Sequence, residues 1–244
     1  MNGLGTDNSK LVVKLKNIIK SILFLFSANK KQLREKLLSA KTDEERVQIC
    51  QSILGVHQST WEITNFVNYI KTNNIQPTVL CEIGTANAGT TLFLASSFPS
   101  IKKILCIDLY VKNKTKLNYY LNEKEIMYVQ SSSYNQKTIN KVKSLLKEEK
   151  IDLLFIDGDH SYDGVKKDFF NYIQFTHSNT VIGFHDIEAD YLTKYNKNTG
   201  KWSGEVPVFW KELKQKLKAY NEFIEFKDQD GQGIGTMLQS NFRD

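Results

Sequence analysis

Short apolar segments that alternate with amphipathic ones dominate the chain from residue 78 onward. Five of them have the length of strands: TVLCEIG (78–84), IKKILCIDLY (101–110), EIMYVQ (125–130), IDLLFIDGD (151–159) and TVIGFHD (180–186). Helical patterns lie between these segments, and strands separated by helices indicate βαβ units with right-handed crossovers. We therefore predict an α/β fold built on a mostly parallel sheet.

The two ends of the chain depart from this alternation. Near the C-terminus, EFIEFK (222–227) and GIGTMLQ (233–239) flank the turn-forming residues DQDGQ, which predicts an antiparallel hairpin. The N-terminal quarter has a helical pattern throughout. Thr42–Glu45 and Ser59–Glu62 match the capping box of a helix start, and Gly55 is placed to end the first of these helices.

Leu11–Phe26 is the most apolar helical segment of the N-terminal quarter. Its Leu, Ile and Phe residues repeat at helical spacing, but Lys14, Lys16 and Lys20 interrupt them. A bilayer-spanning helix needs about 20 mostly apolar residues, so this segment is too short and too polar to span one. It is a candidate for packing on the domain, for a contact in a homo-oligomer, or for peripheral contact with an anionic membrane surface.

Length and composition are those of an ordinary globular protein. The 244 residues are 41% hydrophobic and 25% charged, with a net charge of +6, which suits one α/β domain with an accessory segment. Cys50, Cys81 and Cys106 lack CxxC spacing, which indicates buried thiols in a reducing compartment rather than a zinc site. The first ten residues lack a secretory signal pattern. We expect a cytoplasmic protein, with membrane association through residues 11–26 as the alternative.

The loop after the first strand restricts the ligand. Glu82-Ile-Gly-Thr-Ala-Asn-Ala-Gly89 keeps the outer glycines of a dinucleotide fingerprint, but Ala86 replaces the glycine that lets a pyrophosphate approach. Thr90 stands where a triphosphate-binding loop needs lysine. Asp108 ends the next strand and can accept hydrogen bonds from ribose hydroxyls, while Glu82 can meet an ammonium group. A ligand with a ribose and a cationic amino-acid part, but no diphosphate, is S-adenosylmethionine.

Two strand ends carry both acidic and imidazole groups. IDLLFIDGDH ends with Asp157, Asp159 and His160, and TVIGFHD ends with His185 and Asp186. Ligands of open parallel sheets bind at the carboxyl ends of the strands. Carboxylates with one imidazole suit a hard cation, and histidine titrates near neutral pH. The group predicts a site for a cation, a proton or both. Asp159 fits a fourth ligand or, as we prefer, a turn carboxylate.

These motifs together resemble the class I S-adenosylmethionine-dependent methyltransferases. EIGTANAGTT resembles their first motif, CIDLY the acidic end of their second strand, and VQSSSYN the third-strand segment beside the adenine. DGDHSYDGVKKDF, FHDI and EVPVFWKELK are similar to the branch that contains the cephalosporin-hydroxylase-like proteins and the macrolide-sugar O-methyltransferases. The resemblance covers residues 78–238, with a weaker match at Gln58–Glu62.

The resemblance implies a Rossmann-like, doubly wound, seven-stranded sheet of order 3-2-1-4-5-7-6. It implies a methyltransferase domain over residues 76–244 behind a helical extension over residues 1–75. S-adenosylmethionine would lie over the first three strands and the methyl acceptor over the fourth and fifth. The residues that carry over as cofactor-binding are Glu82, Gly84, Thr85, Ala86, Gly89, Thr90, Asp108, Gln130, Ser131, Ser132 and Asp157.

The same resemblance implies an O-methyltransferase whose acceptor is a hydroxyl of a small molecule, sugar or glycan. In the related sugar enzymes, the strand-four aspartate and an acidic pair after strand five hold a metal. These positions carry over to Asp157, His185 and Asp186, which makes Mg²⁺ or Mn²⁺ the expected ion. His185 departs from the pattern, because an acidic residue stands there in the relatives. His160 carries over as the general base, with Asp157 as the second catalytic residue.

Other functions stay open at this point. The basic charge allows RNA methylation, but the lysines form no stripe interleaved with aromatic residues, so we do not expect nucleic acid as a partner. A catalytically silent S-adenosylmethionine-binding or assembly protein is the second alternative. The long connection 187–205 predicts a lid whose aromatic residues, Tyr191, Tyr195 and Trp202, stack on the acceptor, or else a disordered excursion. His57 and His177 are predicted as surface residues and Trp210 as a core residue.

Overall fold

The computed structural model describes residues 16, 19, 22–24 and 26–243. Its strands are β1 Val79–Ile83, β2 Lys103–Asp108, β3 Glu125–Gln130, β4 Ile151–Ile156, β5 Thr176–His185, β6 Asn221–Phe223 and β7 Ile234–Leu238. Its helices are α2 Asn29–Ser39, α3 Asp43–Leu54, α4 Thr60–Thr72, α5 Gly89–Ser97, α6 Lys114–Tyr120, α7 Gln136–Leu146, α8 Tyr162–Tyr172, α9 Tyr191–Tyr195 and α10 Val206–Lys214.

The strands form one sheet in the order β3-β2-β1-β4-β5-β7-β6, as predicted. Strands β1 to β5 pair in parallel, and β7 runs antiparallel between β5 and β6. The hairpin prediction is therefore confirmed, although β6 ends at Phe223, earlier than its apolar pattern. The chain turns there because the N–H groups of Glu225 and Phe226 both donate to Gln229 Oε1, which takes them out of the sheet.

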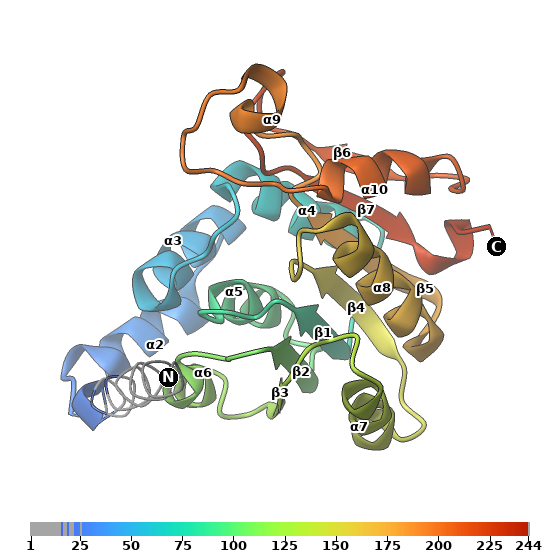
Figure 1. Ribbon diagram of the computed structural model, residues 1–244. Helices are drawn as coiled ribbons and strands as arrows, with labels where there is room; N and C mark the ends of the chain where they lie inside the picture. The colour runs from blue at the N-terminus through green and yellow to red at the C-terminus, as the bar shows by residue number, and fades with distance from the viewer. Residues whose placement is uncertain (1–15, 17–18, 20–21, 25, 244) are drawn as a thin grey trace, which may run out of the picture.

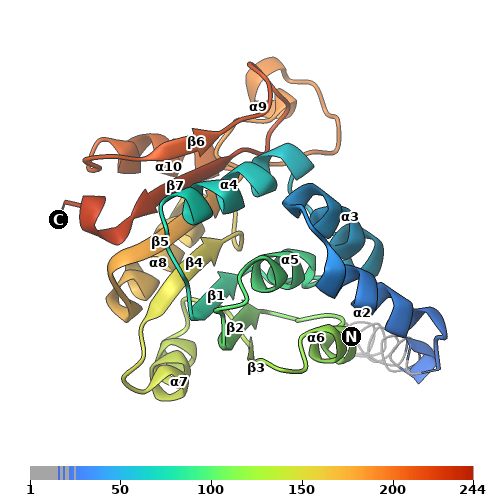
Figure 2. The same ribbon diagram turned by 180° about the vertical axis from the view of Figure 1, so that it is seen from behind.

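Helices cover both faces of the sheet (Figures 1 and 2). Helices α3 to α6 pack over one core, which includes Phe66, Leu80 and Phe155. Helices α7, α8 and α10 pack over the other, which includes Cys81 and Trp210. Leu80 and Cys81 are neighbours in β1 that point into opposite cores, as the period-two geometry of a strand requires. The continuous apolar runs of the sequence follow from burial on both faces.

Neither of the two predicted capping boxes forms in full. Thr42 Oγ1 accepts the N–H of Glu45 at 3.1 Å and starts α3 as expected, but the Glu45 carboxylate accepts from the N–H of Lys41 at 2.9 Å rather than from that of Thr42. The prediction for Ser59–Glu62 is wrong, because Ser59 donates its hydroxyl to Glu225 instead. Glu62 is buried, and its carboxylate accepts from groups in the loop between β6 and β7. Tertiary partners have replaced the local cap at α4.

Residues 11–26 lie largely outside the described residues, so the packing, oligomer and membrane interpretations of this segment stay predictions. One described member, Phe24, is buried against Tyr119 and Tyr120, with ring centroids at 5.5 and 5.9 Å. Another, Phe26, is 84% exposed. In the part of the chain that the structure describes, none of the helices combines the length and apolar character needed to cross a membrane.

Candidate active site

Two adjoining cavities lie at the carboxyl ends of the parallel strands. The first, of about 290 Å³, holds three histidines and is called the histidine cavity. The second, of about 360 Å³, follows the end of β3 and is called the serine cavity. Gly84, Ala86 and Asp157 line both. Of the predicted residues, the histidine cavity adds Thr85, Gly89, Thr90, His160, His185 and Asp186, and the serine cavity adds Asp108, Ser131 and Ser132.

The two outer glycines of the first motif allow close backbone packing around the cavities. Gly84 has a φ of +89°, and a Cβ there would lie 1.8 Å from the carbonyl oxygen of Asp157 at the end of β4. A Cβ on Gly89 would lie 1.7 Å from the carbonyl oxygen of Gly55, which follows α3. Any larger residue would therefore push apart the segments that form the cavity walls.

Asp108 is held at the edge of the serine cavity by backbone donors. Its Oδ2 accepts the N–H of Ala86 at 2.8 Å, and its Oδ1 accepts the N–H of Tyr110 at 2.7 Å. Ala86 itself has a left-handed φ of +43°. Each carboxylate oxygen keeps a further lone pair for a ligand hydroxyl. Ser131 and Ser132 line the same cavity from the end of β3.

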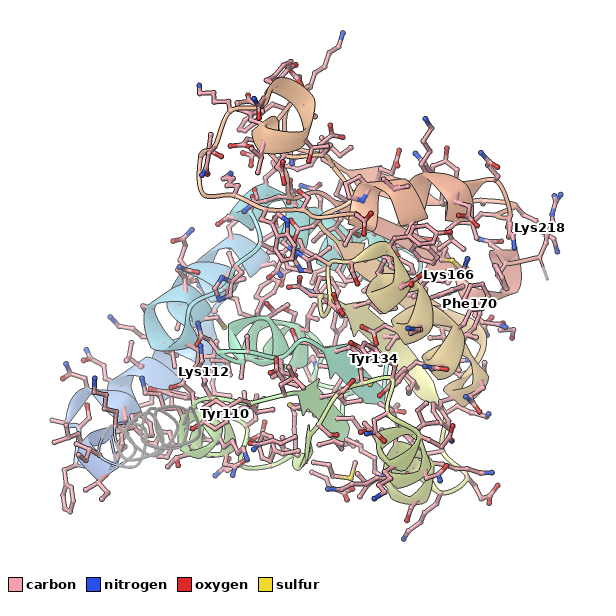
Figure 3. The ribbon with its side chains drawn as sticks, viewed as in Figure 1. Tyr110, Lys112, Tyr134, Lys166, Phe170 and Lys218 are labelled. Carbon is pink, nitrogen blue, oxygen red and sulfur yellow. The ribbon has the colours of Figure 1, made fainter. Side chains whose placement is uncertain are left out.

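A buried carboxyl group supports the wall of the serine cavity. Tyr134, labelled in Figure 3, lies in the loop after β3 and donates its hydroxyl to Asp159 Oδ2 at 3.1 Å. Its neighbour Ser133 donates to Asp168 Oδ1 at 2.5 Å. Asp168 is fully buried, and burial raises its pKa to about 7. A Cβ on Gly158 would lie 2.9 Å from Asp168 Oδ2, so Gly158 packs directly on this group.

Two residues predicted to bind the cofactor line neither cavity. Glu82 is 1% exposed, and its carboxylate accepts the hydroxyl of Thr91. Burial raises the pKa of Glu82 to about 8. The hydrogen bond from Thr91 opposes this shift, and the negative charge of Asp157 adds to it. Gln130 is exposed at the end of β3. Glu82 thus lies directly behind the turn, whereas Gln130 lies outside the cavity wall.

The predicted acids and imidazoles meet in the histidine cavity. Asp157 Oδ1 lies 3.1 Å from His185 Nδ1 and 3.5 Å from His160 Nε2. Asp186 Oδ2 lies 3.2 Å from His185 Nδ1 and 3.5 Å from His160 Nδ1. Each imidazole therefore faces both carboxylates. This set of contacts confines four titratable groups to one wall of the cavity.

These contacts shift the protonation of the group. Burial lowers the pKa of His185, but the charges of Asp157 and Asp186 outweigh burial and hold this pKa well above its usual range. Burial likewise lowers the pKa of His160, and the hydrogen bond to Asp157 with the charges of both carboxylates raises it overall. Burial raises the pKa of Asp157, but the two imidazoles reverse this and hold it well below its usual range. Asp157 is thus stabilised as an anion.

The residues present fit a divalent cation. Asp157, His160 and Asp186 offer ligand atoms that all lie within 4.8 Å of one another. Two carboxylate oxygens and one imidazole nitrogen form a donor set suited to Mg²⁺ or Mn²⁺. His185, the nitrogen ligand predicted from the resemblance, is not in this group. Its Nδ1 faces the carboxylates, and its buried Nε2 has no hydrogen-bond partner among the described residues.

Comparison with known families decides the classification. The family model described as rhamnosyl O-methyltransferase/CmcI matches residues 50–221, which is more than half of the chain. The chain belongs to this family. This membership confirms the resemblance to the CmcI-like branch and the class of S-adenosylmethionine-dependent O-methyltransferase predicted from the sequence.

Individual relatives of this CmcI-like chain are distant. The protein named "Uncharacterized protein y4gI" of Sinorhizobium fredii is 31% identical over 107 residues, which are 44% of this chain. The chain spans about a tenth, 10%, of that relative's length. Cofactor-bound Rv0187 from MTB has a TM-score of 0.58 at 13% identity, over 91% of this chain and 96% of that one. This likeness shows the fold alone.

A second structure is similar in fold to the CmcI-like chain. MycE methyltransferase from the mycinamycin biosynthetic pathway, in complex with Mg, SAH and mycinamycin VI, has a TM-score of 0.54 at 13% identity. The matched region covers 82% of this chain and 56% of that one. At this level of identity the comparison extends to the arrangement of strands and helices, and not to individual side chains.

Several residues of the CmcI-like site were not predicted from the sequence. Gln58 donates its Nε2 to Asp157 Oδ2 at 2.8 Å. His57 is exposed, as predicted, and also lines the histidine cavity. His177, predicted as a surface residue, is half-buried and lines neither cavity, and its Nε2 lies 2.7 Å from Asp152 Oδ1. The weak family resemblance at Gln58–Glu62 was the one sequence signal that linked the segment around Gln58 to the site.

The connection 187–205 returns over the histidine cavity after forming α9. Trp202 stacks on His160 with the ring centroids 5.2 Å apart and the planes at 24°. The Trp202 carbonyl oxygen lies 3.3 Å from His160 Nδ1, and the N–H of Glu205 donates to the carbonyl oxygen of His160 at 2.7 Å. Lys201 and Trp202 line the cavity. An aromatic residue of this connection therefore covers the imidazole group.

Proposed function

We propose that the protein transfers the methyl group of S-adenosylmethionine to a hydroxyl of a sugar, a glycan or another small molecule. The observation that carries this proposal is that two cavities meet at Gly84, Ala86 and Asp157. One cavity has a carboxylate suited to ribose, and the other has the carboxylate and imidazole groups. Methyl transfer requires the sulfonium carbon and the acceptor oxygen in line, and the shared wall is where two such ligands would meet.

We place the cofactor across this wall. Its adenosine would occupy the serine cavity, with Asp108 accepting from the ribose hydroxyls and Ser131 beside the adenine. Its amino-acid part would then lie along the turn 84–88 and the start of α5, where Thr90 lines the histidine cavity. The ammonium group would come near Glu82, which lies behind this turn.

His160 would take the acceptor proton. The carbonyl oxygen of Trp202, 3.3 Å from His160 Nδ1, can only accept a hydrogen bond, so neutral His160 keeps its proton on Nδ1. Nε2 is then the basic atom. During transfer a bond forms between the acceptor oxygen and the methyl carbon, the carbon–sulfur bond breaks, and the hydroxyl proton moves to His160 Nε2. General base catalysis of this kind contributes about 10²-fold to 10⁴-fold in rate.

Asp157, Asp186 and His185 are the proposed metal ligands, for Mg²⁺ or Mn²⁺. A divalent cation held there would make a bound hydroxyl more acidic. Mg in the MycE complex supports this assignment by analogy of fold. His160 competes with His185 for the role of nitrogen ligand, because its ligand atom lies within 4.8 Å of those of both carboxylates. The two histidines therefore need separate tests.

The first experiment tests cofactor and acceptor. Calorimetric titration with S-adenosylmethionine is expected to give a saturable isotherm, and Asp108→Asn should weaken it. Transfer of a labelled methyl group to methyl rhamnoside, methyl glucoside and catechol, with an RNA oligonucleotide in parallel, then identifies the acceptor class. Label in a hydroxyl compound supports the proposal. A protein that binds no S-adenosylmethionine, or that labels only the RNA, contradicts it.

The second experiment separates the histidines. If His185 is the ligand, His185→Ala raises the Mn²⁺ concentration that gives half-maximal turnover, while His160→Ala lowers kcat by about 10²-fold or more without changing that concentration. The opposite result exchanges the two roles. A wild-type activity that is unchanged by chelator would contradict the metal assignment. Only the role of His160 as base would then remain of the proposed catalytic groups.

A further inference from the structure

Gln58 connects the cofactor turn with the proposed catalytic carboxylate. It lies between α3 and α4 and is 6% exposed. Its side-chain Nε2 donates to Asp157 Oδ2 at 2.8 Å, and its Oε1 accepts the hydroxyl of Thr90 at 2.6 Å. Both ends of the amide are therefore hydrogen-bonded, one to the end of β4 and the other to the first turn of α5.

The two hydrogen bonds fix the direction of the amide. A hydroxyl that donates can only be met by the carbonyl oxygen of Gln58, so its NH₂ group must face the carboxylate. Asp157 Oδ2 is thereby directed toward Gln58, and Asp157 Oδ1 is the oxygen that faces His185 at 3.1 Å and His160 at 3.5 Å. The hydrogen bond from Gln58 thus gives the two oxygens of Asp157 different partners: Oδ2 faces Gln58, and Oδ1 faces the two imidazoles.

The backbone around Gln58 is held firmly enough for this role. Gly55 packs on the start of α5, because a Cβ on Gly89 would lie 1.7 Å from its carbonyl oxygen. The N–H of Val56 donates to Gln51 Oε1 at 2.6 Å. These contacts fix the segment that follows α3 against the helix that carries Thr90. The amide of Gln58 therefore has little freedom to follow Asp157 if that carboxylate turns.

We propose that Gln58, oriented by Thr90, is a positioning residue that sets the carboxylate plane of Asp157 toward His160. The inference rests on the proposed role of Asp157 in methyl transfer. If the hydrogen bond from Gln58 is lost, Asp157 turns about its terminal torsion, which is broad for aspartate, and Oδ2 becomes available to the imidazoles. The catalytic geometry then depends on a residue outside the central sheet and before its first strand.

A double-mutant cycle tests this proposal. Gln58→Met keeps the length of the side chain without its hydrogen bonds, and Thr90→Val removes the hydroxyl donor. Gln58→Met is expected to lower kcat between about 10-fold and 100-fold, with KM for S-adenosylmethionine within about twofold. The double variant should be no slower than Gln58→Met, because both changes break the same chain of hydrogen bonds from Thr90 through Gln58 to Asp157. The methyl acceptor in these assays is the hydroxyl compound that wild type methylates fastest in the first experiment.

Gln48 and Thr60 provide a matched control pair. Gln48 Nε2 donates to Thr60 Oγ1 at 3.2 Å in an exposed position away from both cavities. Gln48→Met and Thr60→Val make the same chemical changes and should leave kcat and KM unchanged. Additive losses in the cycle at Gln58 and Thr90, or a fall in cofactor affinity at constant kcat, would overturn the positioning role.

Crystal structures with SAH separate this inference from the proposed function. In Gln58→Met, the carboxylate plane of Asp157 should rotate relative to wild type, while the fold around Gly55 and Gly89 is retained. An unrotated carboxylate overturns the inference even where methyl transfer is normal. If no hydroxyl acceptor is methylated by wild type, the proposed function fails, and the orientation of Asp157 in the two structures still decides the role of Gln58.

Discussion

Binding of S-adenosylmethionine should release a proton from Glu82. In the free protein this carboxyl group is 1% exposed, and burial raises its pKa to about 8. A pKa one unit above the solution pH leaves roughly nine tenths of such groups protonated at pH 7. The ammonium group of the cofactor, placed near the turn in front of Glu82, favours the carboxylate form. The bound state should therefore hold fewer protons than the free state.

The magnitude follows from linkage. If the cofactor lowers the pKa of Glu82 to its ordinary value of about 4.3, binding at pH 7 releases about 0.9 proton. The apparent affinity then rises about ninefold between pH 6 and pH 7, because the fraction of free protein with ionised Glu82 rises by that factor. The window ends at pH 7 because the α-amino group of the cofactor itself titrates near 8.

Calorimetry measures this release directly. Titrations at pH 7 in phosphate and in Tris differ in enthalpy by the proton count multiplied by the difference in buffer ionisation enthalpy. Glu82→Gln should abolish the difference and flatten the affinity between pH 6 and pH 7. Asp168→Asn is the matched control, since it also removes a buried carboxyl group of raised pKa, about 7, but one that lies behind the serine cavity.

A buffer-independent enthalpy in wild type, with equal affinities at pH 6 and pH 7, would refute this reasoning. Glu82 would then stay neutral in the complex, with its role limited to the hydrogen bond from Thr91. The same result would remove the ammonium contact from the proposed cofactor placement. It would leave the ribose contact of Asp108 untouched, because that carboxylate lies on the cavity wall.

Three further outcomes follow from the packing of the site. Gly89→Ala should lower the free energy of unfolding by about 2 kcal/mol or more in urea, because its Cβ would lie 1.7 Å from the Gly55 carbonyl oxygen. The pKa of Asp168 is raised, so its native state keeps a proton that the unfolded chain loses; Tm should fall as pH rises from about 4 to about 7, and Asp168→Asn should reduce this fall. Trp202→Ala removes the ring stacked on His160 and should raise KM for the acceptor severalfold, with the calorimetric affinity for S-adenosylmethionine unchanged.

The sheet could be predicted because its information is local. Strands buried on both faces are continuous apolar runs, and a resemblance in motif order supplied the arrangement of the strands. What the sequence could not supply were contacts across large separations. Ser59 pairs with Glu225 rather than capping α4, and Gln58 reaches Asp157 from 99 residues away in the chain. Neither partner leaves a periodic or spaced signal.

Strand register explains how the predicted acids and imidazoles come to lie together, and which detail of their arrangement the sequence pattern missed. Ile156 pairs with Phe184, so the residue beside Asp157 in the sheet is His185, one position before Asp186. Asp186 returns to the group through a left-handed φ of +61°. The positions of the strand ends in the sequence do not reveal this one-residue offset in pairing. The offset places the imidazole of His185 between the two acids.

That imidazole determines how the site balances its charge. Asp157 and Asp186 are two anions on one cavity wall, and the raised pKa values of His160 and His185 mean that protons can neutralise them. A divalent cation would supply the same neutralisation, and an imidazole must lose its proton before it can act as a ligand. A proton and a divalent cation therefore compete for the imidazole nitrogens that face the two carboxylates. His185 places a group that binds protons between the two acids, and the proposed base role of His160 requires that its own proton be given up.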